Sequence, residues 1–136
     1  MHYHCESMLD RANLPATIVL VEDDEDIARL IGFHLKKAGF ATRWHGTATD
    51  VITESESQPP SLFLLDLMPG IDGFHLCRSI RKHGQLRRLP IIVLTARADR
   101  RDRDLAFESG ADDYVTKPFR PADLISRVRA LCERRC

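Results

Sequence analysis

The sequence lacks an excess of charge of either sign. Its 136 residues include 20 basic and 20 acidic side chains, so the formal net charge is zero. A domain that binds nucleic acid by itself usually carries a basic excess. We therefore expect no direct contact with DNA by this chain alone.

Long hydrophobic runs are also absent. No apolar run approaches the roughly 20 residues that a membrane-spanning helix needs. The first 15 residues are polar and mixed, and they contain no apolar core of a signal peptide. These absences predict a cytoplasmic protein with no membrane association, in which residues 1–15 form a flexible N-terminal extension.

Cysteine is sparse, and its spacing forms no recognisable pattern. The four cysteines are Cys5, Cys77, Cys132 and Cys136, and they include no CxxC pair and no zinc-ligand spacing. Cys132 and Cys136 could share a helix face, which would permit metal binding or oxidation. Reduced thiols in a cytosolic protein are the simpler interpretation.

What the sequence does contain is a regular alternation of short apolar runs with amphipathic segments. Several runs are nearly continuous in Val, Ile and Leu, which is typical of strands covered on both faces in a parallel sheet. The predicted strands are Thr17–Val21, Phe40–Trp44, Leu62–Leu65, Ile91–Leu94 and Tyr114–Thr116.

Five segments with helical spacing lie between and after these runs. Gly39 and Gly110 are placed to end two of the helices, and Pro121 suits a first helical turn. In the charged helix predicted from Asp99 to Ser109, Leu105 and Ala106 are expected to face inward. Asp72 is a candidate cap for the helix that follows it.

Strands that alternate with helices predict an α/β fold. At this size we expect a flavodoxin-like three-layer sandwich, with a five-stranded parallel sheet in the order 2-1-3-4-5 and five helices. Residues 16–136 are expected to form this single domain.

Polar side chains follow four of the five runs. Glu22 and Asp23 follow the first, Asp66 the third, Thr95 the fourth and Lys117 the fifth. Because the carboxyl ends of parallel strands meet at one edge of a sheet, we expect these side chains to converge. Each of them alone suits an ordinary cap or turn, as Asp24 does at a helix start.

The converging groups indicate phosphoryl chemistry. Neighbouring carboxylates raise each other's pKa or recruit a cation, and oxygen ligands with water left over suit Mg²⁺. A carboxylate can attack phosphorus to form an acyl phosphate. A lysine and a hydroxyl can then stabilise charge on the phosphoryl oxygens.

Four segments resemble the signatures of the receiver domain of bacterial two-component response regulators. Their order, spacing and flanking residues agree with that family, and the match runs from about Ala16 to Arg134. The segments are Ile18–Asp26, Leu64–Gly73, Leu94–Ala96 and Gly110–Phe119.

The resemblance implies a role for each residue at the edge. Asp66 would accept a phosphoryl group from a sensor histidine kinase. Asp23 would bind Mg²⁺ directly and Glu22 through water, and Asp66 and the main-chain carbonyl of Met68 would complete the protein ligands. Thr95 and Lys117 would contact the phosphoryl group.

The resemblance also implies a switch. Phosphorylation in receivers draws the matching threonine inward, and an aromatic ring rotates with it; here these are Thr95 and Tyr114. The peptide bond between Lys117 and Pro118 is a candidate for the cis form.

Charges on the last elements match the OmpR/PhoB transcription-factor subfamily in sign, at positions that pair across an active dimer. A two-fold interface needs a self-complementary patch, which mixed charges supply. A solvated charged face is the other interpretation. The candidate dimer residues are Arg103, Asp112, Asp113, Asp123, Arg127 and Arg134.

Transcription factors of this subfamily carry a DNA-binding domain after the receiver, so DNA contact would belong to a domain absent from this chain. The alternative is a stand-alone receiver that regulates a protein partner. An aspartate-based phosphatase of the haloacid dehalogenase type is disfavoured because it needs a second Asp where Met68 stands. A flavin-binding protein is disfavoured because the first strand is followed by acids, which would repel phosphate.

Overall fold

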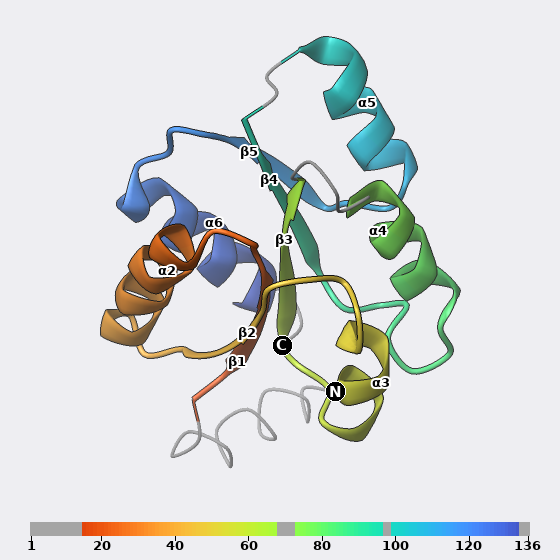
Figure 1. Cartoon of the computed structure of the whole chain (residues 1–136), viewed down its shortest axis with the longest axis horizontal. Helices are drawn as coiled ribbons and strands as arrows, with labels where there is room; N and C mark the ends of the chain where they lie inside the picture. The colour runs from red at the N-terminus through yellow and green to blue at the C-terminus, as the bar shows by residue number, and fades with distance from the viewer. Residues whose placement is uncertain (1–14, 68–72, 97–98, 134–136) are drawn as a thin grey trace.

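The computed structural model describes residues 15–67, 73–96 and 99–133, in which strands and helices alternate along the chain (Figure 1). The strands are β1 (Thr17–Val21), β2 (Ala41–His45), β3 (Leu62–Leu67), β4 (Ile91–Thr95) and β5 (Asp113–Thr116). The helices are α2 (Glu25–Lys37), α3 (Val51–Ser57), α4 (Gly73–Lys82), α5 (Arg100–Glu108) and α6 (Pro121–Glu133).

The five strands form one parallel sheet in the order β2-β1-β3-β4-β5. This confirms the predicted fold class and strand order. The carboxyl ends of the strands therefore share one edge of the sheet, and residues that follow different strands become neighbours there.

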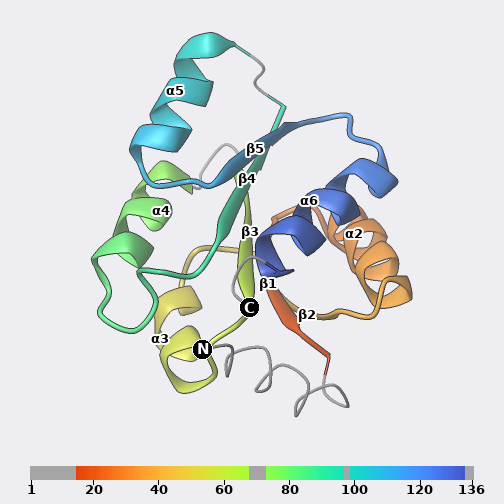
Figure 2. The same cartoon turned by 180° about the vertical axis from the view of Figure 1, so that it is seen from behind.

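Helices cover both faces of the sheet, so that the molecule has three layers (Figures 1 and 2). Alternate residues of each strand enter opposite cores, because successive side chains point to opposite faces. Ile18 and Leu20 of β1 pack with α2 and α6, whereas Val19 and Val21 pack on the side of α3, α4 and α5. The central strands are consequently buried on both sides, as their apolar sequences predicted.

The turn between β1 and α2 is fixed by a helix cap. The Asp24 side chain accepts hydrogen bonds from the main-chain N–H groups of Asp26 at 2.9 Å and Ile27 at 3.2 Å. These contacts satisfy donors that the first helical turn leaves unpaired, which confirms Asp24 as a cap. Residues 22 and 23 are thereby held between a buried strand and a capped helix.

The side chain of Leu105 and the bounds of four strands differ from the predictions, with β2, β4 and β5 differing by one residue at one or both ends. Of the two residues of α5 expected to face inward, Ala106 is buried as predicted, whereas Leu105 is 39% exposed. The third strand continues past Leu65 to Leu67, since its pairing with β4 extends through the partners of Asp66 and Leu67. Asp66 thus belongs to the strand itself. The predicted cap at Asp72 and residues 1–14 of the predicted extension lie outside the described residues.

Within the described part of the chain, none of the helices has the length and apolar character needed to cross a membrane.

Candidate functional site

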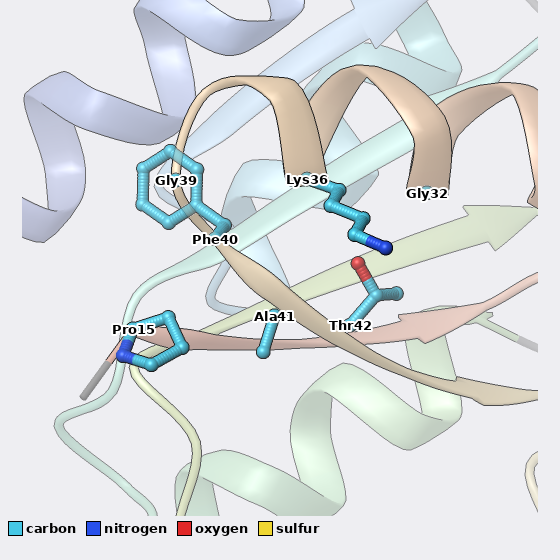
Figure 3. Close-up of a pocket in the computed structure, with 7 residues that line it drawn as sticks. All are labelled: Pro15, Gly32, Lys36, Gly39, Phe40, Ala41 and Thr42. Carbon is cyan, nitrogen blue, oxygen red and sulfur yellow. The ribbon is translucent and has the colours of Figure 1, made fainter.

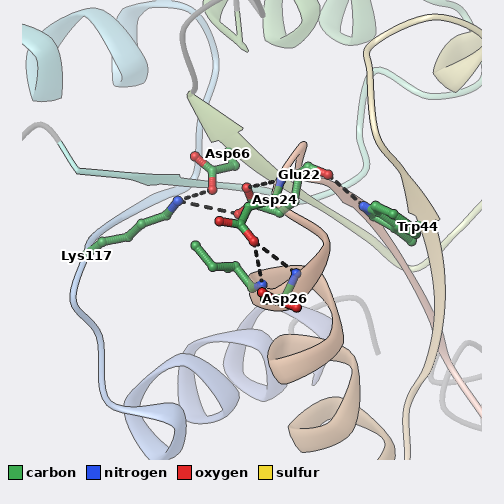
Figure 4. A network of polar contacts seen from close by, with 7 residues as sticks. Glu22, Asp24, Asp26, Trp44, Asp66 and Lys117 are labelled. Atoms are coloured by element: carbon green, nitrogen blue, oxygen red, sulfur yellow. Dashed lines mark hydrogen bonds and ion pairs between the residues drawn. The ribbon is translucent and has the colours of Figure 1, made fainter.

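The carboxyl ends of β1, β3 and β5 bring together two acids and one ammonium group. Glu22 directly follows β1, Asp66 lies near the end of β3, and Lys117 directly follows β5. Nζ of Lys117 makes an ion pair with Oδ2 of Asp66 and lies 3.4 Å from Oε1 of Glu22 (Figure 4). Both acids are only 1% exposed. Three residues distant in sequence thus form one buried charged cluster.

The pKa values of two side chains in the cluster are raised above their ordinary values. Burial first, and then the adjoining Asp66 carboxyl group, raise the pKa of Glu22 to about 7. Burial alone would lower the pKa of Lys117, but its contacts with Asp66 and Glu22 outweigh burial and raise that pKa above its ordinary value. Lys117 therefore remains a fixed ammonium at neutral pH.

Thr95 completes the same edge at the end of β4. It is fully buried, and its main-chain carbonyl accepts the main-chain N–H of Lys117 at 2.8 Å. The contact ties the lysine backbone to the threonine. The peptide bond between Lys117 and Pro118 is cis, which confirms that prediction.

The oxygen atoms at this edge fit a divalent cation of the Mg²⁺ type. Oδ1 of Asp66 is buried and makes no hydrogen bond among the described residues. Together with Glu22 it offers only carboxylate oxygens, the ligands that Mg²⁺ prefers.

The full predicted ligand set is not assembled in the described residues. Asp23 lies exposed on the turn after Glu22, and Met68 lies outside the described ranges. In residues 15–67, 73–96 and 99–133, no three His, Cys, Asp or Glu side chains are grouped in a way that could hold a metal ion. The metal ligands therefore stay a prediction.

Tyr114 of β5 lies where an aromatic switch was expected. It is partly buried, and its ring packs on the core formed with α3, α4 and α5. The ring centroids of Tyr114 and Phe107 are 6.4 Å apart, and Phe107 of α5 is 40% exposed. Tyr114 thus connects the interior to the surface of α5.

The charges predicted to form a dimer face are engaged within the chain. Arg127 of α6 contacts Asp113 at 2.9 Å and Asp123 at 3.1 Å, and these partners raise its pKa above the ordinary value. The guanidinium of Arg103 lies 6.0 Å from the Phe107 ring centroid. Arg134 is outside the described residues. The dimer face remains a prediction.

Asp112 has a role inside the fold that the sequence did not indicate. Its Oδ2 accepts from Arg81 and from the main-chain N–H of Ile91, both at 2.8 Å. Arg81 also donates to the carbonyls of Gly110, Arg87 and Leu89 at 2.9, 2.8 and 2.6 Å. This arginine hub, defined as Arg81 with Asp112 and the three carbonyls, joins the segments before β4 and β5.

Trp44 is a second residue that sequence reasoning missed. No site residue was predicted in or after the second run, yet the indole N–H of Trp44 donates to the main-chain carbonyl of Glu22 at 2.6 Å (Figure 4). The chain contains one tryptophan. Its place next to the end of a strand that pairs with β1 was the available signal.

A pocket of about 540 Å³ lies away from this edge (Figure 3). It is lined by the last turn of α2 and by the beginning of β2, including Lys36, Phe40 and Thr42. Because β2 is parallel to the other strands, its beginning lies at the opposite edge from Asp66. The pocket therefore takes no part in the chemistry of the acidic edge.

The sequence of this chain is similar to those of known proteins. A family model described as the response regulator receiver domain matches residues 18–129. The chain is 44% identical over 119 residues to the transcriptional regulatory protein GltR of Pseudomonas aeruginosa, which covers 87% of this chain and 49% of that protein. It is 42% identical over 118 residues to the DNA-binding response regulator MtrA of Mycobacterium tuberculosis, covering 86% of this chain and 50% of that protein. The chain thus spans about half the length of the curated relatives it matches.

Solved structures give the same result. A putative response regulator from Chloroflexus aurantiacus superposes with a TM-score of 0.82 at 35% identity, covering 88% of this chain and 98% of that one. The BeF3-activated receiver domain of RstA from Klebsiella pneumoniae has a TM-score of 0.78 at 34% identity, with coverage of 85% and 97%. The chain belongs to the response regulator receiver domain family, and its relatives include OmpR-like transcription regulators.

Proposed function

We propose that this receiver domain takes a phosphoryl group from a sensor histidine kinase onto Asp66, in a reaction that requires Mg²⁺. The observation that carries the proposal is the buried Asp66 carboxylate, which contacts Lys117 and keeps Oδ1 without a hydrogen bond among the described residues. Such an oxygen has lone pairs available for attack on phosphorus. Glu22, Asp23, Asp66 and the main-chain carbonyl of Met68 are the proposed metal ligands.

In the proposed transfer, an Asp66 oxygen bonds to phosphorus while the phosphorus–nitrogen bond of a phosphohistidine breaks. The imidazole leaves with the bonding electrons and takes up a proton. Bound Mg²⁺ would neutralise charge on the transferring phosphoryl oxygens. Lys117 supplies a fixed positive charge beside Asp66, and the Thr95 hydroxyl donates to a phosphoryl oxygen.

The domain is proposed to act as a switch and to catalyse only its own phosphorylation and dephosphorylation. Capture of the phosphoryl group by Thr95 would leave space into which the Tyr114 ring rotates, which changes the surface formed by α5, β5 and α6. That surface is the proposed site of a phosphorylation-dependent homodimer. The contact between the tilted rings of Tyr114 and Phe107 supports a path from the interior to it.

The proposed output is control of transcription in the cytoplasm through a DNA-binding domain that this chain does not include. GltR is named a transcriptional regulatory protein and MtrA a DNA-binding response regulator, and each is about twice as long as the matched region. The alternative is a stand-alone receiver that docks on a protein partner. The residues encoded after Cys136 in the natural gene distinguish the two.

Intact-mass spectrometry tests the phosphoryl acceptor. With Mg²⁺ and acetyl phosphate, the wild-type protein should gain the mass of one phosphoryl group, and Asp66→Asn should gain none. Asp24→Asn is the matched control, because it changes another acid of the same edge while Asn still caps a helix. Equal labelling of Asp66→Asn and wild type would overturn the assignment.

A further inference from the structure

Glu22 is held at all of its polar groups, and strand β2 holds both of its main-chain groups. Its N–H donates to the carbonyl of His45 at 3.0 Å, which continues the parallel ladder beyond the end of β1. Its carbonyl accepts from the indole N–H of Trp44 at 2.6 Å. The side chain accepts from the N–H of Asp24 at 3.1 Å and contacts Lys117.

The indole contact fixes more than Glu22 itself. The carbonyl of Glu22 and the N–H of Asp23 belong to the same peptide unit, which is planar and rotates as one body. A hydrogen bond to this carbonyl therefore restricts the orientation at which the chain enters Asp23. Trp44 lies on one side of the turn, and the Asp24 cap holds the other (Figure 4).

An ordinary surface tryptophan is the competing interpretation. Trp44 is 47% exposed, and isolated exposed apolar side chains are common on protein surfaces. A surface role would need only the ring, which a phenylalanine also provides. The short contact from the indole nitrogen is what a phenylalanine cannot make.

We propose that Trp44 is a positioning residue for the metal-binding turn of this receiver: its indole N–H orients the Glu22–Asp23 peptide so that both carboxylates can serve one Mg²⁺ ion. The inference rests on the proposed function of the Asp66 site. This role would make the carboxyl end of edge strand β2 part of the site, although β2 contributes none of the proposed ligands.

The test is the Mg²⁺ affinity of three proteins, measured from the rise in thermal unfolding temperature with Mg²⁺ concentration. Trp44→Phe keeps a ring and removes the donor. Arg43→Gln is the matched control, because Arg43 is the preceding residue of β2 and its side chain donates to Gln58 rather than to Glu22. It loosens the same edge strand without touching the turn.

Loss of one hydrogen bond corresponds to a change of about 2- to 10-fold in a binding constant. Trp44→Phe should raise the dissociation constant for Mg²⁺ by that factor, and Arg43→Gln should leave it within about 1.5-fold. Phosphorylation by acetyl phosphate provides a second readout. The rate of Trp44→Phe should be reduced at low Mg²⁺ and recover to the wild-type value at saturating Mg²⁺.

Three outcomes would overturn the proposal. A wild-type Mg²⁺ affinity in Trp44→Phe would show that the indole does not position the turn. An equal loss in Arg43→Gln would assign the effect to general loosening of β2. Absence of Mg²⁺ binding by the wild type would contradict the proposed metal requirement and the role of Trp44 together, which separates this failure from the first two.

Discussion

The two edges of the sheet pair their charged side chains in opposite ways. At the carboxyl edge, two buried acids share the single ammonium of Lys117, and Oδ1 of Asp66 makes no hydrogen bond among the described residues. At the amino edge, Arg81 donates to three main-chain carbonyls and to Asp112, which also accepts the Ile91 N–H. One edge has an excess of acceptors and the other is satisfied.

The edge with unsatisfied acceptors is suited to a reaction, and the edge with satisfied hydrogen bonds contributes to the stability of the fold. An unsatisfied polar group inside a protein costs free energy and persists where function requires it. A satisfied network strengthens the fold and has little capacity to bind anything further. The acidic edge therefore keeps acceptors that a ligand could use, and the arginine hub holds the loops before β4 and β5 in place.

Removing the hub should produce the largest loss of stability. Arg81→Met leaves three carbonyls and the partly exposed Asp112 without their cation, and we expect a loss of about 2–4 kcal/mol in the free energy of unfolding, measured in urea. Asp66→Asn should change the same quantity by less than about 1 kcal/mol, because it also relieves repulsion from Glu22. A larger loss from Asp66→Asn than from Arg81→Met would reverse the comparison.

A glycine offers an independent way to disturb the hub. Gly110 has a φ of +113°, and a Cβ added there would lie 2.5 Å from Cγ of Arg81. Gly110→Ala must therefore displace Arg81 and also strain the backbone. It should destabilise the protein in the same direction as Arg81→Met while leaving phosphorylation of the folded protein intact.

A smaller and pH-dependent effect is expected near the hub. Cys77 of α4 is fully buried, and burial raises the pKa of its thiol from 9.0 to about 11. The unfolded thiol ionises first, so the contribution of Cys77 to stability is complete below pH 9 and is lost as the pH rises to 11. The stability advantage of wild type over Cys77→Ala should shrink by about 1–2 kcal/mol across this range.

The free energy of unfolding of both proteins is measured in urea at each pH. The titration of all other groups affects both proteins alike and cancels in the difference between them. A difference between wild type and Cys77→Ala that stays constant from pH 8 to pH 11 would mean that the thiol ionises equally well in the folded and unfolded chains.

The smallest effect on the monomer is expected on the surface of α6. Arg127 is 39% exposed and pairs with Asp113 and Asp123, so Arg127→Gln should cost less than about 1 kcal/mol. If the same charges pair across a dimer, the variant should nevertheless fail to increase in size with beryllofluoride and Mg²⁺. Size-exclusion chromatography of wild type and variant checks this, and dimerisation of the variant as strong as that of wild type would contradict the proposed face.

The sequence predicted what depends on chain order and missed what depends on side-chain direction. Glu22, Asp66 and Lys117 were correctly predicted to lie together, because the carboxyl ends of parallel strands share one edge of the sheet. Leu105 was misplaced because α5 has charges around most of its circumference, so that its rotation is decided by packing of Ala106.

Trp44 and Arg81 were missed for a related reason. Both act through main-chain carbonyls far away in sequence, such as those of Glu22 and Gly110. Nothing in the local sequence states which carbonyls a long side chain will reach. Only the register of β1 with β2, and the loops before β4 and β5, bring these groups within hydrogen-bond distance.

The central claim is that Asp66 carries the phosphoryl group, and chemical trapping tests it most directly. After treatment with acetyl phosphate and Mg²⁺, borohydride reduces an aspartyl phosphate to homoserine, which peptide mass spectrometry can place at a single residue. We predict homoserine at position 66 in the wild-type protein, at a level that falls to background without Mg²⁺. Homoserine at position 23, or a phosphoryl group recovered on a serine, threonine or histidine with residue 66 unmodified, would contradict it.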